Sequence, residues 1–594
     1  MRFFQARPFF MDFSSLTSSQ AQAVRYTGGP LIVLAGPGTG KTRTLTFRIA
    51  HLIESGLAAP DRILAVTFTN QAAEEMRSRL EQSPLGNRGL PGPWISTFHG
   101  FCLRFLKENL SSPRQLLSEQ ESIDLLKETV QEQFPDFPKR QIKELARRIS
   151  LAKNSLIPPG SSGFPGGWED CPSWPSCYRA YQEQLSLRHL WDFDELILQT
   201  VYLLEENPLL QTKVHIGFPF VLVDEFQDIN TAQYRLFQLI SQKTGSWMVI
   251  GDPCQAIYGF RGARADFFLY LQQDYPQAKM VTLQDTFRLN RTVLEASNQV
   301  LKDADGRPSA QTEGPPFIPV VGLSSAEAEG EYIAGFIEKE MGGLGLSSGI
   351  QEQSSAEGTG PQPGFADFAV LYRLHAQGEI IAGCLSRRGI PFKKIQEIHW
   401  VERPEIRTCL EHLKSYQDLR LTPVIALERV VKDFPSLFSS SPEGSKVLHR
   451  LRLEAASFKG TFDDFLENLS LQTGLDTYEP DQETVKLLTL HAAKGLEFPV
   501  VLIAGCEDNL LPLTLLGLSD KEEERRLFYV GLTRAKEKVI LTWTRKRTFF
   551  GQTREQNLSP FVGDIDDTLK TSLFFRGDGS RNRPRKKQMD LFSH

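Results

Sequence analysis

Short apolar runs alternate with longer amphipathic segments along most of the chain. The runs have the length of buried strands, and turns followed by segments with helical spacing separate them. They lie at residues 31–34, 62–69, 220–223, 247–250, 317–321, 369–374 and 500–504. Strands that alternate with helices are typical of parallel sheets covered by helices. The pattern therefore predicts an α/β protein.

The first run leads into Ala35–Thr42, which reads Ala-Gly-Pro-Gly-Thr-Gly-Lys-Thr, and a helix-like segment follows from Arg43 to Ile53. Glycines let backbone N–H groups turn toward phosphate oxygens, and the helix N-terminus adds partial positive charge. We expect Lys41 to reach the β- and γ-phosphates and the Thr42 hydroxyl to bind Mg²⁺. Ala35 stands where the general pattern has glycine. The alternative is a Gly-rich hairpin without a ligand, which the Lys-Thr spacing disfavours.

Two further runs end in polar residues suited to nucleotide hydrolysis. Residues 220–223 precede Asp224, which is placed to bind Mg²⁺ directly or through water, and Glu225, which is placed to deprotonate the attacking water. Residues 247–250 lead to Gln255, which can sense the γ-phosphate through a hydrogen bond. A strand ending in Asp-Glu is common by chance and becomes specific when a phosphate loop precedes it.

Aromatic residues follow several predicted strands, at the sheet edge where α/β proteins bind ligands. Phe68 ends one strand, and Phe98 with His99 lies in the later Ser-Thr-Phe-His-Gly segment. A Gly-punctuated loop combines aromatic rings with a cation, as single-strand recognition requires. This loop carries Tyr258, Phe260 and Arg261. For each phenylalanine taken singly, ordinary core packing is the alternative.

Three other residues suit contacts with a nucleotide. Gln20 precedes the phosphate loop, and its carboxamide offers the donor and acceptor that the adenine edge needs, although a solvated glutamine is the alternative. Phe287 could stack on adenine, and Arg288 could reach a phosphate.

Composition narrows the class of protein. The 594 residues are 40% hydrophobic and 23% charged, as expected for a globular chain of three or four domains. Net charge is −5, so any basic groove for nucleic acid must be local. No apolar run approaches the ~20 residues that span a membrane. The Phe-rich start does not resemble a signal peptide, and Met11 is an alternative first residue.

The seven cysteines are scattered and never spaced Cys-x-x-Cys. This usage favours a reducing compartment, and we expect a cytoplasmic protein that does not associate with membranes.

The order and spacing of these motifs resemble the UvrD/Rep/PcrA family of superfamily 1 DNA helicases over roughly residues 14 to 548. Asp224, Glu225, Gln227 and Asp228 match the family's Asp-Glu-x-Gln-Asp. Phe260 replaces a usual Trp, Phe287 a usual Tyr, and Gln71 a usual Lys. Downstream, Thr489 to Phe498 and Glu524 to Lys536 resemble two later helicase motifs.

The resemblance implies roles for particular residues. The implied catalytic residues are Lys41, Asp224, Glu225, Gln255, Arg288 and Arg534. Arg534 would act as an arginine finger, and a surface salt bridge is the alternative for this residue. ATP contacts are expected from Gln20, Ala35, Gly36, Pro37, Gly38, Thr39, Gly40, Lys41, Thr42, Arg43, Phe287, Arg288, Glu497 and Arg534, and Mg²⁺ ligands from Thr42 and Asp224. DNA contacts are expected from Phe68, Asn70, Phe98, His99, Tyr258, Phe260, Arg261 and His491.

The family also implies two RecA-like α/β domains with parallel sheets, each carrying a mainly helical insertion and together binding ATP in a cleft. The first domain is expected at 1–110 and 200–284, with its insertion at 111–199. The second is expected at 285–384 and 484–550, with a shortened accessory subdomain at 385–483 and a flexible tail at 551–594. The segment from Gly342 to Phe365, rich in Gly, Ser, Gln and Glu, is expected to be a flexible insertion.

The implied function is an ATP-dependent 3′→5′ DNA helicase or single-strand translocase, acting in repair, replication or recombination on single strands and single-strand/duplex junctions. Two alternatives remain open: a translocase that strips proteins from DNA with little unwinding, and a clamp-bound ATP-dependent DNA-binding switch. A helicase–nuclease is disfavoured because the tail after the last motif is short.

The C-terminal tail is basic and ends Gln-Met-Asp-Leu-Phe-Ser-His. One interpretation is a disordered basic tail that touches nucleic acid. The other is a peptide ligand, because Gln-x-Asp-Leu-Phe resembles the bacterial sliding-clamp-binding motif. Its contacts would come from Gln588, Asp590, Leu591 and Phe592.

Overall fold

The computed structural model forms two compact units, each built around a parallel sheet. It describes residues 11–82, 92–112, 114–161, 173–241, 245–302, 308–342, 363–395, 404–416, 421–435, 438, 442–458, 460–471, 483–514, 520–549 and 551–575. The first unit comprises Met1–Ala35, Lys41–Leu283 and Glu397–Tyr478, and the second comprises Gly36–Gly40, Gln284–Gln396 and Glu479–His594.

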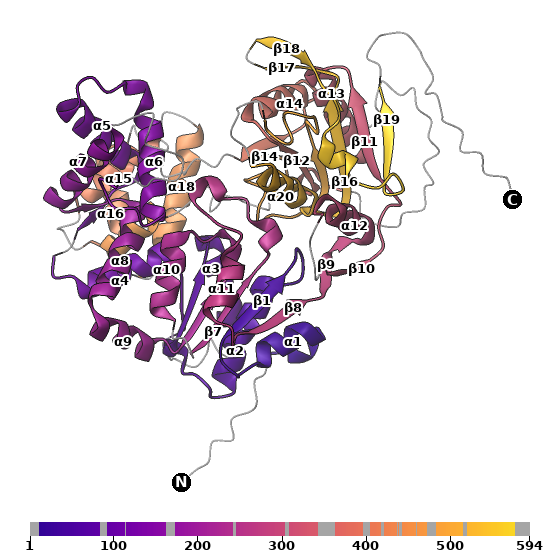
Figure 1. Ribbon diagram of the computed structural model, residues 1–594. Helices are drawn as coiled ribbons and strands as arrows, with labels where there is room; N and C mark the ends of the chain where they lie inside the picture. Colours follow the sequence, from indigo (N-terminus) through magenta and orange to yellow (C-terminus); the bar gives the residue numbers. More distant parts are fainter. Residues whose placement is uncertain are drawn as a thin grey trace, which may run out of the picture. The chain divides into compact units, whose positions relative to one another are not determined.

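The first unit contains a six-stranded parallel sheet in the order β3-β2-β6-β7-β1-β8 (Figure 1). Its strands are β1 (Leu31–Ala35), β2 (Ile63–Thr67), β3 (Trp94–Thr97), β6 (Phe220–Val223), β7 (Ser246–Gly251) and β8 (Lys279–Leu283). Along β1, Leu31 and Val33 pack into one hydrophobic cluster while Ile32 packs into another. Both sheet faces are therefore covered, which explains why the strands are continuous apolar runs.

Helices that precede β1 or follow these strands cover the sheet. They are α1 (Ser18–Arg25), α2 (Lys41–Glu54), α3 (Asn70–Glu81), α4 (Phe98–Asn109), α10 (Thr231–Ile240) and α11 (Phe267–Asp274). Polar side chains fix where they begin: Thr17 caps α1 in a capping box with Gln20, and Thr69 caps α3.

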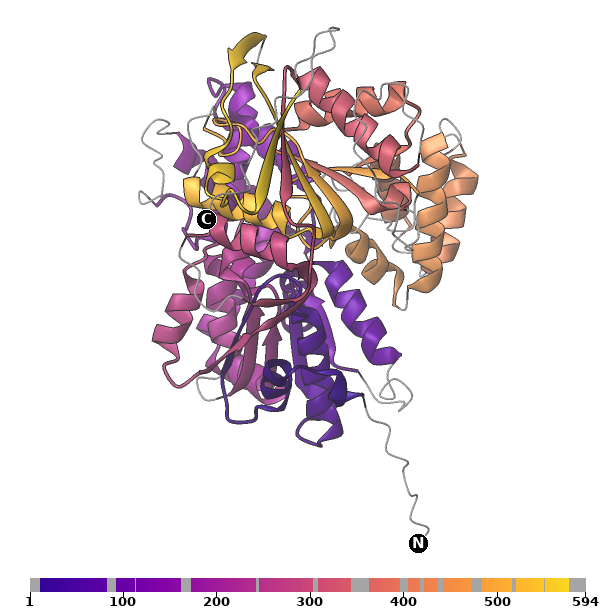
Figure 2. The same ribbon diagram turned by 90° about the vertical axis from the view of Figure 1, so that its right-hand side faces the viewer.

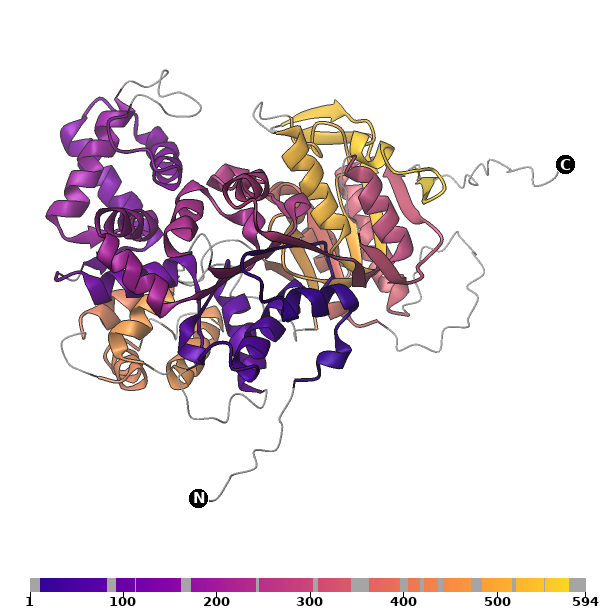
Figure 3. The ribbon, with the colours of Figure 1, turned by 60° about the horizontal axis from the view of Figure 1, so that its bottom comes forward.

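A group of helices is inserted between β3 and β6. It contains α5 (Glu119–Gln133), α6 (Ile142–Asn154), α7 (Trp174–Leu187), α8 (Phe193–Glu206) and α9 (Pro208–Gly217). Helices α5, α6 and α7 share a small core of buried side chains. Figure 3 shows the helices of this insertion in violet. Helix α8 also packs on α4 and α10, so it joins this insertion to the sheet domain.

The accessory subdomain has its own helical core. Its helices are α15 (Pro404–Lys414), α16 (Pro423–Asp433), α18 (Pro442–Ser457) and α19 (Phe462–Leu471). It groups with the first unit, where Lys414 Nζ lies 2.8 Å from Glu121 Oε1 of α5. The predicted start at residue 385 is too early, because β13 (Phe392–Ile395) belongs to the second sheet.

The second sheet has seven parallel strands in the order β13-β14-β12-β15-β16-β11-β19. The other strands are β11 (Ile318–Leu323), β12 (Phe368–Tyr372), β14 (Val485–Thr489), β15 (Phe498–Ile503), β16 (Ala535–Thr544) and β19 (Lys570–Phe574). Helices α13 (Ala326–Glu340) and α14 (His375–Arg387) pack together along this sheet, as Figure 2 shows in pink and salmon. Helices α12 (Arg291–Val300) and α20 (Lys521–Leu532) also contact each other.

The prediction of a flexible tail from residue 551 is wrong for residues 551–575. They contain β18 (Gln552–Glu555), α21 (Pro560–Gly563) and β19. Strand β18 forms a hairpin with β17 (Lys546–Phe549), and β19 pairs with β11 at the sheet edge. Strands β18 and β19 lie at exposed edges, and their residues are largely polar. They therefore lack the apolar runs that identify buried strands in a sequence.

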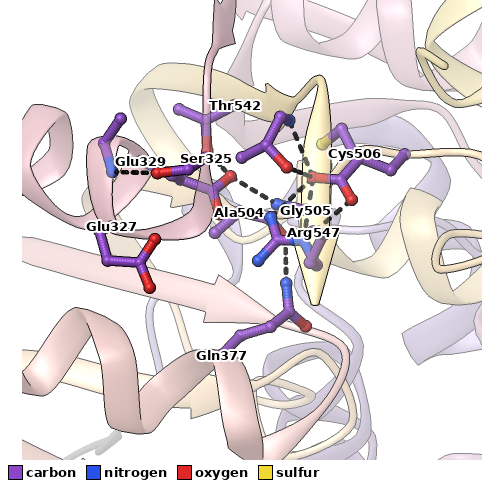
Figure 4. Close-up of polar contacts among 12 residues, drawn as sticks. Ser325, Glu327, Glu329, Gln377, Ala504, Gly505, Cys506, Thr542 and Arg547 are labelled. Carbon is purple, nitrogen blue, oxygen red and sulfur yellow. Dashed lines mark hydrogen bonds and ion pairs between the residues drawn. The ribbon is translucent and has the colours of Figure 1, made fainter. Parts of the chain in front are cut away.

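A buried ion cluster ties β17 to the rest of the second unit (Figure 4). Arg547 Nη2 lies 2.6 Å from both Glu329 Oε2 of α13 and Glu507 Oε1, which follows β15. Glu329 Oε1 also accepts hydrogen bonds from Gly505 N and Thr542 Oγ1. All three charged side chains are buried, so the pairing offsets a large desolvation cost.

Among the described residues, no helix combines the length and the apolar character that crossing a membrane requires.

Candidate nucleotide and DNA-strand sites

The phosphate loop turns between β1 and α2. Gly38 and Gly40 adopt φ angles of 72° and 80°, which favour glycine. A Cβ on Gly38 would also lie 2.5 Å from Arg288 Cβ and Thr286 Oγ1. The loop therefore needs glycine both for its backbone conformation and for close approach.

Strand β9 (Asp285–Asn290) supports this loop. Thr286 Oγ1 donates a hydrogen bond to Pro37 O over 2.7 Å, and Phe287 N donates to Gly38 O over 3.1 Å. Within the loop, Thr39 Oγ1 donates to Gly36 O over 2.8 Å. Sequence reasoning missed Thr286, whose only signal was its place beside Phe287 and Arg288.

The predicted catalytic side chains of the first unit lie together. Thr42 Oγ1 donates a hydrogen bond to Asp224 Oδ2 over 3.2 Å, and Lys41 Nζ lies 3.8 Å from Glu225 Oε1. Burial, reinforced by the neighbouring Glu225, raises the pKa of Asp224 to about 7. Glu225 has a φ of 49°, an uncommon conformation for a residue other than glycine. This conformation marks the turn where strand β6 ends.

A second polar group connects the Asp-Glu turn to Gln255. Gln227 Nε2 donates to Glu225 Oε2, while Gln227 Oε1 accepts a hydrogen bond from Asp252 N over 2.9 Å. Asp252 Oδ2 in turn accepts from Gln255 Nε2 over 2.7 Å. Burial raises the pKa of Asp252, and the nearby Lys41 charge opposes that rise. The sequence analysis assigns no role to Asp252, although its hydrogen bonds join Gln227 and Gln255, which the sequence analysis does select.

The donor set near Thr42 fits a magnesium ion. A hydroxyl and a carboxylate supply the hard oxygen atoms that Mg²⁺ prefers, and one or two protein ligands suffice when phosphates and water complete the shell. Among the described residues, no three His, Cys, Asp or Glu side chains form a group that could hold a metal ion. A cation beside Asp224 would offset the cost of its buried negative charge.

Gln20 and Arg43 are the other predicted nucleotide contacts in this unit. Gln20 is buried, and its Oε1 accepts a hydrogen bond from Thr17 N over 3.1 Å, so the solvated alternative is wrong. Arg43 Nη2 donates to Ser15 Oγ over 2.6 Å.

The second unit carries the remaining predicted ATP contacts. Arg288 Nε forms an ion pair with Glu497 Oε2 at 2.6 Å, and the Phe287 side chain is 57% exposed. Arg534 is only 1% exposed, so the alternative of a surface residue is wrong. Its guanidinium donates to Val530 O over 2.9 Å and to Leu496 O over 3.3 Å.

Three predicted strand-contacting rings form a continuous series. Phe68 stacks on Tyr258 with ring centroids 5.4 Å apart, and Tyr258 meets Phe260 edge-on at 6.0 Å. The Arg261 guanidinium lies 5.5 Å from the rings of both Tyr258 and Phe260. Tyr258 is buried whereas Phe260 is 45% exposed. The outermost ring and the cation therefore remain available to a ligand.

The other predicted DNA contacts differ in their surroundings. Phe98 is buried in the hydrophobic core of the first unit, which agrees with the alternative of ordinary core packing. His99 packs edge-on against Phe193 at 5.6 Å, and burial lowers its pKa to about 4. Asn70 begins α3, and His491 follows β14; both are half-buried. Gln588, Asp590, Leu591 and Phe592 lie outside the described residues.

Two family models match most of the chain. Residues 16–276 match the UvrD/REP helicase N-terminal domain, and residues 281–443 and 445–546 match the UvrD-like helicase C-terminal domain. The chain is 30% identical to the ATP-dependent DNA helicase PcrA of Bacillus subtilis strain 168, over 97% of this chain and 89% of the relative. The chain belongs to the UvrD/Rep helicase family.

Other relatives in this family are similar over nearly their whole length. The PcrA helicase of Leuconostoc citreum is 28% identical, over 97% of this chain and 88% of the relative. That of Staphylococcus aureus strain MRSA252 is also 28% identical, over 93% and 86%. The predicted resemblance and the α/β fold with parallel sheets are thus confirmed.

Proposed function

We propose that this protein is an ATP-dependent DNA helicase that moves along single-stranded DNA in the 3′→5′ direction. The observation that carries the proposal is the shared position of two groups in the first unit. The Lys41, Thr42, Asp224 and Glu225 cluster and the ring series of Phe68, Tyr258 and Phe260 both follow strands of one parallel sheet. Ligand sites in such folds lie at this edge.

The proposed hydrolytic chemistry assigns one task to each polar group. The backbone of Gly36–Gly40 and Lys41 hold the phosphates, and Glu225 accepts a proton from the attacking water. Mg²⁺, held by Thr42 and Asp224, would neutralise charge on the phosphate oxygens. Gln255, fixed by Asp252, reports whether the γ-phosphate is present.

The second unit contributes to the same reaction in this proposal. Phe287 stacks on adenine, Arg288 contacts a phosphate, and Arg534 stabilises charge on the transferring phosphoryl group. The exposed ring of Phe287 and the match to the UvrD-like helicase C-terminal domain support these roles. We further propose contacts from Gln20 and Arg43 to the nucleotide, and from Asn70, His99 and His491 to DNA.

Movement requires a grip on DNA that can be released. Stacking of a base on an aromatic side chain contributes about 1–3 kcal/mol, which an ATP cycle can make and break. The exposed Phe260, backed by Tyr258 and flanked by Arg261, provides such a platform.

The proposal is tested by strand displacement on duplexes with a 3′ tail, a 5′ tail or blunt ends, with ATP or a non-hydrolysable analogue. We expect ATP-dependent displacement of the 3′-tailed duplex alone. Displacement of the 5′-tailed duplex alone would contradict the polarity. ATP hydrolysis stimulated by DNA without displacement would refute unwinding. Release of streptavidin from biotinylated single strands would then identify a protein-stripping translocase.

We also propose that the C-terminal peptide Gln588–Phe592 binds a bacterial sliding clamp. Its support is the sequence Gln-Met-Asp-Leu-Phe at the end of a basic, polar tail. The apolar pair Leu591 and Phe592 would fill a pocket on the partner, beside a hydrogen bond from Gln588.

A further inference from the structure

Three segments of the first unit meet at the side chain of Asn154, the last residue of α6. Its Oδ1 accepts a hydrogen bond from Asn230 Nδ2 over 2.8 Å, and its Nδ2 donates to Asp194 Oδ1 over 3.0 Å. Asn154 and Asn230 are both buried. One carboxamide thus links the helical insertion, through α6 and α8, to the segment that follows the Asp-Glu turn.

Asn230 lies where the hydrolytic turn and the aromatic loop converge. It follows Asp228 by two positions, and its Oδ1 accepts from Gln233 N to cap α10. Its backbone forms a bridge with Ala263, and Ala263 N donates to Tyr258 O over 3.1 Å. Asn230 therefore connects the segment that follows the Asp-Glu turn to the loop that carries Phe260.

The opposite side of Asn154 is firmly anchored. The adjacent Lys153 is completely buried, with its Nζ 2.7 Å from Asp192 Oδ2 and 3.1 Å from Glu195 Oε1. Tyr181 OH also donates to Asp192 Oδ2 over 3.0 Å. Helices α6, α8 and α10, labelled in Figure 1, pack against one another.

We infer that Asn154 is a positioning residue that couples the aromatic DNA-contacting loop to the hydrolytic turn through Asn230. The inference rests on the proposed function. The carboxamide is required because this position must donate on one side and accept on the other. An aspartate could not donate to Asp194, and its charge would face another carboxylate.

The test measures ATP hydrolysis without DNA and across a titration of oligo(dT) for the variants N154A, N154D and N154D combined with D194N. Burial raises the pKa of Asp194 to about 6, so assays at about pH 8 keep this carboxyl ionised. The control is N109A, because Asn109 Nδ2 donates within its own helix, to Phe105 O at 2.8 Å.

We expect hydrolysis without DNA to stay within about twofold of wild type in every variant. The oligo(dT) concentration for half-maximal stimulation should rise about tenfold in N154A and more in N154D, as the loss of one or two buried hydrogen bonds predicts. The double variant re-forms both hydrogen bonds, with donors from residues 194 and 230 to a carboxylate at 154. It should recover to within about threefold of wild type.

Normal stimulation in N154D, or a double variant no better than N154D, would overturn the inference. N154A provides the same test if N154D does not fold, because it removes the contacts without adding charge. Thermal unfolding of each variant separates lost coupling from lost stability. Wild-type protein whose ATP hydrolysis ignores oligo(dT) would instead show that the proposed function is wrong.

Discussion

Thr42 Oγ1 donates a hydrogen bond to Asp224 Oδ2 over 3.2 Å, although the two residues are 182 positions apart in the chain. Thr42 lies at the start of α2, which follows β1, and Asp224 directly follows β6. Only β7 separates these two strands in the sheet. Because parallel strands end at the same edge, the fold brings a hydroxyl and a carboxylate together beside the phosphate loop.

Glu225 should be needed for hydrolysis but not for binding of ATP. In the variant E225Q we expect hydrolysis to fall about 10²–10⁴-fold because the proposed base is lost, with ATP affinity retained. K41A should lose affinity as well, because Lys41 is proposed to hold the phosphates. Fluorescent-nucleotide binding and phosphate release measure the two effects. E205Q, in a surface pair with Arg235, is the control. Hydrolysis by E225Q above a tenth of the wild-type rate would contradict the assignment.

His99 should make the fold less stable as pH falls. Burial lowers its folded pKa to about 4 from an ordinary value near 6.5, so between these values the unfolded chain binds the proton and the folded chain does not. The free energy of unfolding should therefore decrease as pH falls from about 6.5 to about 4. Urea unfolding of wild type and of H99Q across this pH range gives the free energy of unfolding of each, and the difference between them isolates the contribution of His99. A difference that does not vary with pH would show that His99 titrates normally.

Phe260 should contribute to DNA affinity rather than to ATP binding. Loss of its stacking in F260A should weaken binding of single-stranded DNA by about 5- to 150-fold, equivalent to about 1–3 kcal/mol. Fluorescence anisotropy with labelled oligo(dT) measures the change. F317A is a matched control, because Phe317 is 42% exposed and Phe260 is 45% exposed. Equal affinities for the two variants would remove Phe260 from the proposed strand site.

Arg547 should be essential for the stability of the second unit. R547M leaves Glu329 and Glu507 buried without their cation, so we expect destabilisation of about 3–5 kcal/mol. R452M removes an arginine from an exposed pair with Glu428 and should cost less than about 1 kcal/mol. Thermal unfolding followed by calorimetry compares the two. A similar, small loss in both variants would contradict the structural role of the cluster.

The C-terminal peptide should be required for clamp binding and dispensable for catalysis. L591A combined with F592A should abolish pull-down by a bacterial sliding clamp and leave ATP hydrolysis intact. K586A combined with K587A tests the alternative basic tail, and should weaken DNA contact without affecting the clamp. Clamp binding that survives loss of Leu591 and Phe592 would refute the peptide assignment.

Much of the first sheet and its hydrolytic residues follow from sequence patterns. Runs such as 31–34 and 220–223 are apolar throughout because both faces of the strands are buried, so they are recognisable without alternation. The polar edge strands β18 and β19 carry no such signal, so the sequence predicts a flexible tail in their place. Phe98 is a case in which the sequence predicts a DNA contact but the structure shows a core residue. Whether a ring next to a strand end packs inward or outward depends on the layers around it, which the local sequence does not specify.

The phosphate loop, the Asp-Glu pair and the family are recognisable in the sequence, since they depend on residue types at short spacing. Which distant groups meet is known only from the fold: Thr286 supports the loop, Asp252 joins Gln227 to Gln255, and Asn154 bonds to Asn230. A side-chain hydrogen bond requires about 3 Å between donor and acceptor, and strand order and helix packing set that distance.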